Sequence, residues 1–156
     1  MAIKKFLIIA LVITILCSIF YLISILKAQK LDKIKVNIKN QNYKLEIVQT
    51  VPQRAKGLSD RKSLCSNCGM LFVFKKPDYH VFWMKNTLIP LDIIFLDENK
   101  NITAIHTAPI QPNTSAFQLK RYSCPTLSLY VIELNAGEAQ KLNLKVGDKI
   151  NLPNKI

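Results

Sequence analysis

The sequence has few of the residues and none of the motifs on which most enzyme classes depend. It contains two histidines, one tryptophan and four glycines in 156 residues. It has no Gly-x-Ser-x-Gly elbow, no His-Glu-x-x-His helix and no phosphate-binding loop. A lone histidine is more often a packed or exposed side chain than a general base, so neither His80 nor His106 indicates catalysis. The sequence favours a non-catalytic protein without cofactor or resident metal.

Acidic residues are absent from the first 31 positions and sparse afterwards. The net charge is +12, and Lys4, Lys5 and Lys27 flank the first apolar run. The rest of the chain carries 19 basic and 10 acidic residues. Such an excess fits an ordinary solvated surface, or an anionic ligand or cell-envelope component as partner. Because the lysines are scattered, without an arginine-rich stripe or interleaved aromatic residues, the pattern does not indicate nucleic-acid binding.

Residues 6–26 form an uncharged, mostly apolar run of 21 residues. A helix of that length spans roughly 30 Å, the hydrocarbon thickness of a bilayer. The sequence therefore predicts a transmembrane helix within an N-terminal anchor, residues 1–30. A single N-terminal span usually exports the domain on its C-terminal side, so we expect residues 31–156 to form an extracytoplasmic domain on a single-pass protein of the cell membrane.

Two features separate this anchor from a cleaved leader. A secretory signal peptide has a shorter apolar region and a small-x-small cleavage site, for which only Ala28 is a weak candidate. A lipoprotein signal has a small residue before its cysteine, whereas Leu16 precedes Cys17. Both observations favour an uncleaved segment.

The remaining chain alternates between short apolar segments and turns. Apolar residues alternate with lysines on both sides of the turn at 40–42, which predicts a β-hairpin. One short helix is expected after it, because Thr50 can cap a helix, Pro52 suits its first turn and Gly57 can end it. Further strands are expected at 69–74, 80–86, 91–96, 102–107, 127–134 and close to 152, with a long connection at 109–125. Many short strands without a βαβ repeat indicate an all-β domain, barrel-like or a sandwich.

The stretch around Trp83 and Lys85 contains polar residues between two apolar runs. Residues that alternate on a strand share a face, so Lys85 emerges beside Trp83. A partly buried lysine needs a carboxylate, and Asp92 and Glu133 are lone acids inside apolar strands. They form either a structural ion-pair network or part of a ligand-binding cleft. The candidate ligand-binding residues are Trp83, Lys85, Asn86, Asp92, Glu133, Arg54 and Arg61.

The exported part contains three cysteines. Cys65 and Cys68 form a Cys-x-x-Cys pair that leads into a strand rather than a helix, which is unlike a thioredoxin-type redox site. A zinc knuckle would need Cys124 and a histidine in addition. Outside the cytosol a disulfide is the default, either between Cys65 and Cys68 or between one of them and Cys124.

Several motifs in this order resemble the family known as domain of unknown function 192. They are Arg54-x-x-Gly57-Leu58-x-x-Arg61-x-x-Leu64, Gly69-Met70-Leu71-Phe72-x-Phe74, Phe82-Trp83-Met84-Lys85-Asn86-Thr87-x-Ile89-Pro90-Leu91-Asp92, Tyr130-Val131-Ile132-Glu133-Leu134-x-Ala136-Gly137 and Gly147-Asp148. The resemblance covers roughly residues 35–152 and implies a small, often exported, all-β domain of barrel or sandwich type, with no established reaction. One departure concerns the site, because Ser59 stands where the family usually has methionine after Gly-Leu. The pair Cys65 and Cys68 is also additional to the family pattern.

These observations predict a membrane-anchored, extracytoplasmic binding module of unknown ligand. Two alternatives remain: a hydrolase-type enzyme that uses Asp92 and Glu133 as an acid–base pair, and a purely structural protein-interaction domain. An open cleft beside Lys85 would favour ligand binding, whereas a sealed ion-pair network would favour a structural role.

Overall fold

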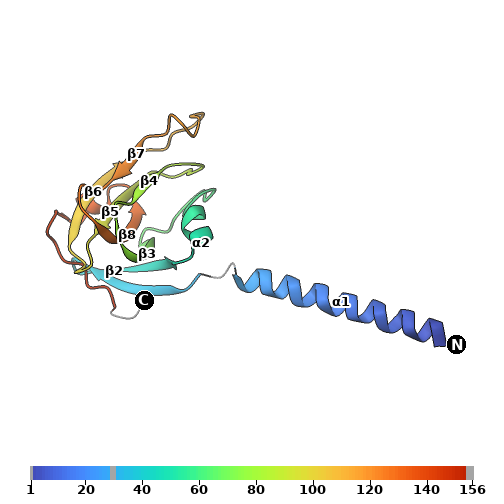
Figure 1. Cartoon of the computed structure of the whole chain (residues 1–156). Coiled ribbons are helices and arrows are strands. Elements are labelled where there is room, and N and C mark those ends of the chain that lie inside the picture. Colours follow the sequence, from blue (N-terminus) through green and yellow to red (C-terminus); the bar gives the residue numbers. More distant parts are fainter. Residues whose placement is uncertain (1, 29–30, 154–156) are drawn as a thin grey trace. The chain divides into compact units, whose positions relative to one another are not determined.

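The computed structural model describes residues 2–28 and 31–153. Contacts divide the chain into two units, Met1–Leu31 and Asp32–Ile156. The first unit contains helix α1, Ala2–Ala28 (Figure 1). The predicted span, residues 6–26, includes positions whose side chains lie outside the described residues. Among the residues that are described, none of the helices meets the length and apolarity required to cross a membrane.

The second unit begins with the predicted hairpin. Strands β1, Lys33–Ile38, and β2, Gln41–Val48, pair antiparallel, with Ile38 opposite Gln41. The two residues between them, Lys39 and Asn40, both have positive φ, at 46° and 68°. That conformation matches the right-handed twist of the two strands and closes the hairpin tightly. The predicted hairpin is confirmed.

A capped helix follows the hairpin, as the sequence predicts. Helix α2 covers Val51–Lys56, and the Thr50 side chain accepts a hydrogen bond from the Gln53 backbone. The Gln53 side chain bonds back to the Thr50 backbone N–H, which completes a capping box. Gly57 follows with φ of 47°, a value that favours glycine, and ends the helix beside the sheet.

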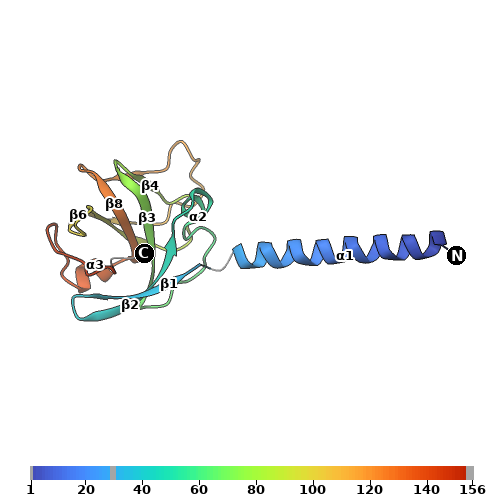
Figure 2. The same cartoon turned by 60° about the horizontal axis from the view of Figure 1, so that its bottom comes forward.

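Six strands form one open mixed sheet (Figures 1 and 2). Their order is β1-β2-β3-β8-β5-β6, and β2 and β3 are the parallel pair. The four strands not yet bounded are β3, Cys68–Asp78; β5, Leu91–Leu96; β6, Ile102–Ala108; and β8, Ser128–Asn135. Of the expected all-β domain, barrel-like or a sandwich, the β-rich character is confirmed, but the sheet does not close into a barrel, because β1 and β6 remain its two edges. The domain is mostly β, with few short helices.

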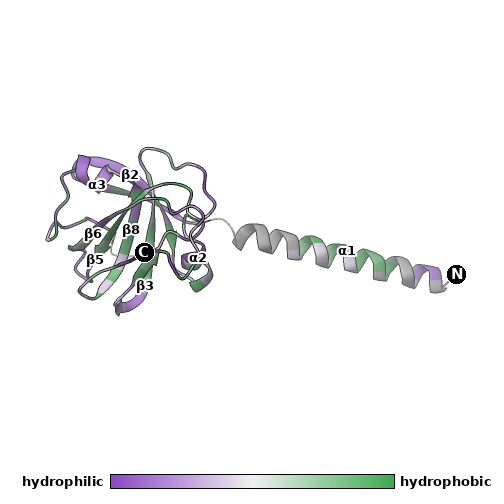
Figure 3. Cartoon of the chain, turned by 90° about the horizontal axis from the view of Figure 1, so that it is seen from above, coloured by the Kyte–Doolittle hydropathy of each residue, from purple (hydrophilic) through white to green (hydrophobic). Residues whose placement is uncertain are grey.

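The two faces of this sheet have different roles. One face packs Leu45, Leu71, Ile94, Ile132 and Leu134 against the C-terminal segment, which includes the short helix α3, Glu138–Lys141. In Figure 3 the ribbon is mostly coloured hydrophobic along β5 and β8 and hydrophilic along α3. The other face carries the alternate residues of the same strands. It is this second face that holds the candidate site.

A small second sheet belongs to the site side of the domain. Strands β4, Val81–Trp83, and β7, Arg121–Ser123, pair antiparallel and form a sheet of their own. The predicted strand at 80–86 is therefore shorter than expected, and the predicted loop at 109–125 contains β7. The strand expected near residue 152 is reduced to an isolated bridge between Asn101 and Lys149.

Candidate functional site

Strand β8 carries a lone carboxyl group on the second face of the sheet. Glu133 pairs with Met70 of β3 and with Ile93 of β5, so apolar residues flank it on both sides. The residue is 6% exposed, and its side chain has no hydrogen-bond or ion-pair partner among the described residues. Burial raises the pKa of this carboxyl to about 8. Glu133 is therefore mostly protonated at neutral pH and able to donate a hydrogen bond as well as accept one.

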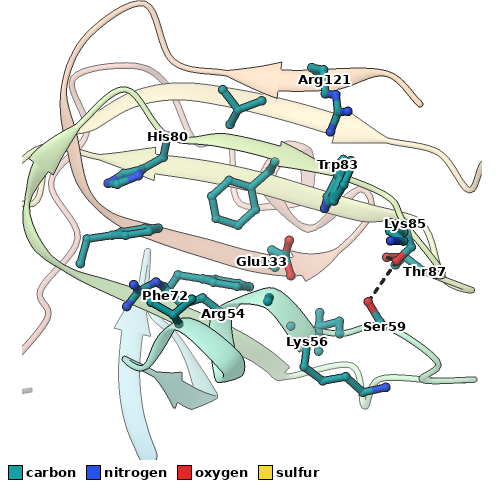
Figure 4. A pocket seen from close by; sticks show the side chains of 17 residues that line it. Arg54, Lys56, Ser59, Phe72, His80, Trp83, Lys85, Thr87, Arg121 and Glu133 are labelled. Atoms are coloured by element: carbon teal, nitrogen blue, oxygen red, sulfur yellow. Dashed lines mark hydrogen bonds between the residues drawn. The ribbon is translucent and has the colours of Figure 1, made fainter. Parts of the chain in front are cut away.

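Glu133 faces a cavity of about 540 Å³, which we call the aromatic pocket (Figure 4). Its walls come from α2 and the segment that follows it, from β3 and β4, and from Arg121 on β7. Phe72 and Phe82 meet edge to face with ring centroids 4.9 Å apart. Phe74 stacks on His80 with centroids 3.4 Å apart, and Trp83 forms the wall beyond them. A flat or apolar body therefore has several ring faces and edges to contact.

Four cationic side chains surround this pocket: Arg54, Lys56, Lys85 and Arg121. Two of them are engaged within the protein. Arg54 donates to the backbone carbonyls of Gln49 and Val73, and Lys56 pairs with Asp60.

The other two cations flank the only tryptophan. The Arg121 guanidinium lies 4.1 Å and the Lys85 amine 5.4 Å from the centroid of the Trp83 ring. Neither forms an ion pair with a carboxylate in the part of the chain that the structure describes. Arg121 also donates a hydrogen bond to the Ala116 carbonyl at 3.3 Å. Because no carboxylate neutralises either cation in the described residues, both can attract an anionic group of a ligand.

His80 is a neutral member of the pocket wall. Burial lowers the pKa of its imidazole, Arg54 lowers it further, and Asp78 opposes the shift. Its Nε2 atom is buried without a hydrogen-bond partner among the described residues. The histidine thus contributes a flat ring and an unused nitrogen rather than a charge.

The expected pairing of Lys85 with Asp92 is wrong. Lys85 is exposed, whereas Asp92 is completely buried and lies on the opposite face of the sheet from Glu133. One Asp92 oxygen accepts from the Thr107 hydroxyl at 2.7 Å, and the other accepts from the Ala139 backbone N–H at 2.8 Å. Asp92 therefore holds α3 against β5 and β6. Because the side chains of Asp92 on β5 and Glu133 on β8 point to opposite faces of the sheet, they cannot act together on one substrate.

The other predicted ligand-binding residues divide into two groups. Trp83, Lys85, Glu133 and Arg54 all line the aromatic pocket. Asn86 and Arg61 do not line it. Asn86 has φ of 53° in a tight turn and borders a neighbouring hollow, and Arg61 pairs with Glu46.

Ser59, the residue that departs from the family pattern, also lines the pocket. Its hydroxyl donates to the Lys85 carbonyl at 3.0 Å (Figure 4), and the Asp60 N–H bonds to the Asn86 carbonyl at 2.8 Å. These two bonds fix the backbone of the segment that carries Lys85. A small polar residue at this position therefore supports the pocket wall without filling the pocket.

Sequence reasoning missed several pocket residues, for two different reasons. Phe72 and Phe74 alternate with buried residues on β3, and alternation could have placed both on the face of Met70 and Glu133. Arg121 gives no comparable signal, because its strand has three residues and lies inside a long polar connection. Only pairing with Trp83 across the small sheet brings Arg121 to the site.

The cysteine alternatives are resolved by position. The Cys65 and Cys68 sulfurs lie at disulfide distance, with Cα atoms 5.1 Å apart. Cys124 is buried elsewhere, and its Sγ lies 3.1 Å from the Thr103 hydroxyl oxygen. Within the described residues, no group of three or more His, Cys, Asp or Glu side chains is arranged to hold a metal ion. The local pairing is thus the one that the structure contains.

Comparison with known proteins identifies the family of this chain and two similar solved structures. Residues 33–152 match the model of DUF192, domain of unknown function 192, which is described as "Uncharacterized ACR". A protein of unknown function from Novosphingobium aromaticivorans DSM 12444 is 31% identical, with a TM-score of 0.63 over 78% of this chain and 85% of the other. A putative transcription regulator from Sinorhizobium meliloti 1021 is 28% identical, with a TM-score of 0.66 over 76% of this chain and 91% of the other. No curated protein matches.

Proposed function

This chain belongs to the family known as domain of unknown function 192, and because that family is uncharacterised we propose a function from the site alone. The domain is a binding module for a small anionic ligand that has a flat or apolar face. The observation that carries this proposal is the buried Glu133 carboxyl, which lacks a protein partner among the described residues and faces an aromatic pocket. A buried polar group without a partner costs about 1–3 kcal/mol, and a bound ligand would supply the missing hydrogen bond.

The charge of the ligand follows from the pocket rim. Lys85 and Arg121 lie over Trp83 without a carboxylate partner in the described residues, and Glu133 is neutral at neutral pH. The pocket therefore presents positive charge at its rim and no full negative charge on its inner wall. Anions are favoured by such a site, and a carboxylate or phosphate can take two parallel hydrogen bonds from an arginine.

A binding role is better supported than catalysis. A hydrolase-type mechanism requires two groups that reach one substrate, and Asp92 and Glu133 lie on opposite faces of the sheet. The neutral His80 ring is stacked on Phe74 and has no carboxylate to orient it by a hydrogen bond among the described residues. Nucleic acid is not part of the proposal, because the lysines are scattered along the sequence without an arginine-rich stripe or interleaved aromatic residues.

The first prediction uses Trp83 as a reporter of its own pocket. Phenyl glucuronide and phenyl glucoside differ by one carboxylate, and we expect the glucuronide to bind the full-length chain about tenfold more tightly, since an anion gains a charge-assisted bond. Arg121→Gln should remove most of this preference. Titration followed by tryptophan fluorescence measures it without a label, because the chain has one tryptophan.

Arg61→Gln is the matched control, since Arg61 pairs with Glu46 outside the aromatic pocket and receives the same substitution. It should leave the preference for the glucuronide unchanged. Equal affinity of the wild-type chain for both probes, or no saturable binding of either, would contradict the proposed anionic ligand.

We further propose that residues 6–26 anchor the chain in the cell membrane and that residues 31–156 are extracytoplasmic. The support is the uncharged run of 21 residues between Lys5 and Lys27, together with the disulfide-distance pair at Cys65 and Cys68. Disulfides persist mainly outside the reducing cytosol.

The second prediction tests this anchoring. After alkaline carbonate extraction of cell membranes, the chain should remain in the pellet, and a variant that lacks residues 6–26 should not. Protease added to intact cells should digest residues 31–156. Release of the full-length chain by carbonate would refute the anchor, and protection of the domain in intact cells would refute its orientation.

A further inference from the structure

A second hollow adjoins the aromatic pocket. It has a volume of about 420 Å³ and lies between the turn after β4 and the loop between β6 and β7. We call it the loop hollow. It shares two lining residues, Lys85 and Thr87, with the aromatic pocket. The two spaces are therefore neighbours, and the segment of Lys85 to Thr87 forms the wall between them.

The shared wall is held firmly in place. The Lys85 carbonyl accepts from the Ser59 hydroxyl at 3.0 Å and from the Thr87 hydroxyl at 3.3 Å. The Thr87 N–H bonds to the Met84 carbonyl at 3.2 Å, and Met84 is 2% exposed. Because its backbone is fixed in this way, the wall presents the Lys85 side chain, which is exposed, between two preformed spaces.

The loop hollow has both an apolar and a polar lining. The apolar part comes from Met84, Leu88, Ile110, Pro112, Ala116 and Leu119. Side-chain amides and hydroxyls line it, from Asn86, Thr87, Gln111, Asn113 and Thr114. The Gln111 oxygen accepts from the Lys120 backbone N–H at 2.8 Å, which fixes the direction of this amide. Its nitrogen is then buried without a hydrogen-bond partner among the described residues. Each of the two spaces is therefore lined by one residue with a hydrogen-bond donor that has no partner among the described residues: Gln111 in the loop hollow and the protonated Glu133 in the aromatic pocket.

Acidic residues are missing from two segments that border this region. The sequence has no aspartate or glutamate between residues 79 and 91 or between residues 99 and 132, whereas Lys85, Lys120 and Arg121 lie there. Both segments border the two spaces. An anionic ligand therefore meets basic side chains and no acidic side chain along these two segments.

We propose that the aromatic pocket and the loop hollow form one bipartite site for an acidic oligosaccharide, whose charged group lies at Lys85 on the shared wall. Sugar hydroxyls donate and accept hydrogen bonds, as do amides, hydroxyls and a protonated carboxyl. The apolar faces of a sugar ring fit the aromatic walls on one side. This inference rests on the proposed function. It extends the ligand from one small anionic molecule to several linked sugar units.

An acidic peptide matches the positive charge of this site, but it does not match the hydrogen-bonding groups of the loop hollow. Peptides bound in extended form usually add backbone hydrogen bonds to the exposed edge of a sheet. The loop hollow instead offers side-chain amides and hydroxyls on loops. The saccharide is therefore the ligand that the observations favour, and the peptide becomes an outcome of the test.

The third prediction tests the bipartite site by ligand length. Trigalacturonate should bind the full-length chain at least tenfold more tightly than galacturonate, when binding is followed by the fluorescence of Trp83. Gln111→Ala combined with Asn113→Ala should reduce trigalacturonate to the affinity of the monosaccharide and leave galacturonate unaffected. Gln118→Ala is the matched control, because Gln118 lies on the same loop, accepts from Ser115 and does not line the loop hollow. It should change neither affinity.

The possible results separate this inference from the proposed function. If phenyl glucuronide binds and trigalacturonate shows no gain over galacturonate, the bipartite site is wrong and the aromatic pocket stands. Equal binding of trigalacturonate and neutral maltotriose would overturn the role of Lys85, and tighter binding of a triglutamate peptide would overturn the saccharide. If no acidic probe of any length binds, the bipartite site and the proposed function fail together.

Discussion

Raising the pH from 4.5 to 8.5 should lower the free energy of unfolding of the wild-type chain by about 4–5 kcal/mol relative to that of a Glu133→Gln variant. The ordinary pKa of this carboxyl is 4.5, and burial raises it to about 8 in the folded state. Each unit of pKa difference corresponds to about 1.4 kcal/mol. Because the folded state holds its proton more tightly, this contribution is complete below pH 4.5 and is lost as the pH rises through 8.

Comparison with the variant is needed because other groups titrate in the opposite sense. Arg61 and Lys33 outweigh the effect of burial on Glu46 and lower the pKa of its carboxyl, so stability from Glu46 is lost as the pH falls. Burial lowers the pKa of His80, which also reduces stability at acid pH. Glu133→Gln keeps the size of the side chain and removes only its titration. Urea denaturation at a series of pH values, followed by Trp83 fluorescence, measures the free energy of unfolding of both proteins. If this free energy depends on pH in the same way in both, Glu133 is not a buried acid with a raised pKa.

Replacement of Asp92 by alanine should cost about 3 kcal/mol of stability. Its carboxylate accepts two hydrogen bonds, from the Thr107 hydroxyl and the Ala139 backbone N–H, and Ala139 is 5% exposed. Hydrogen bonds to a charged group contribute about 1.5–3 kcal/mol, and the buried N–H would be left without an acceptor. Thermal or urea denaturation measures the loss, and Asp92→Asn should lose less because an amide oxygen can still accept one of the two bonds.

The control for Asp92 is Lys85→Ala. Lys85 is exposed and contacts Trp83 rather than Asp92, so this change should alter stability by less than about 0.5 kcal/mol. The double variant should show the sum of the two single effects. Thr107→Val, in contrast, should couple with Asp92→Ala because the two side chains share a hydrogen bond. Coupling between Lys85 and Asp92 above about 1 kcal/mol would mean that an ion pair exists between them after all.

Local signals in the sequence predicted the elements that depend on near neighbours. The hairpin of β1 and β2 requires alternation and a two-residue turn, and α2 requires Thr50, Gln53 and Gly57, all within a few positions. The order of the strands in the sheet could not be obtained in the same way. Strand β8 lies between β3 and β5, and β4 leaves this sheet to pair with β7. Both arrangements join segments that are far apart in the sequence.

The same distinction explains the partial prediction of the site. Glu133 could be recognised as a lone acid in an apolar strand, and Trp83 and Lys85 as polar interruptions of another. Asp92 has the same sequence pattern as Glu133, but its side chain faces α3 because β5 places it beside Leu134. Which face a strand residue occupies relative to a ligand pocket depends on packing from the whole domain. The sequence predicts Lys85 on a strand beside Trp83, but β4 ends at Trp83 and Lys85 is exposed in the turn that follows.

The central claim is that Glu133 is a neutral acid that faces the aromatic pocket without a protein partner among the described residues. Carbon NMR of the full-length chain labelled at the side-chain carboxyls of its four glutamates tests this claim directly, with Glu133→Gln to assign the signal. We predict that the Glu133 carboxyl titrates with a pKa of about 8 and that its signal moves when phenyl glucuronide is added. A pKa close to the ordinary 4.5, together with a signal that the glucuronide leaves unchanged, would contradict the claim.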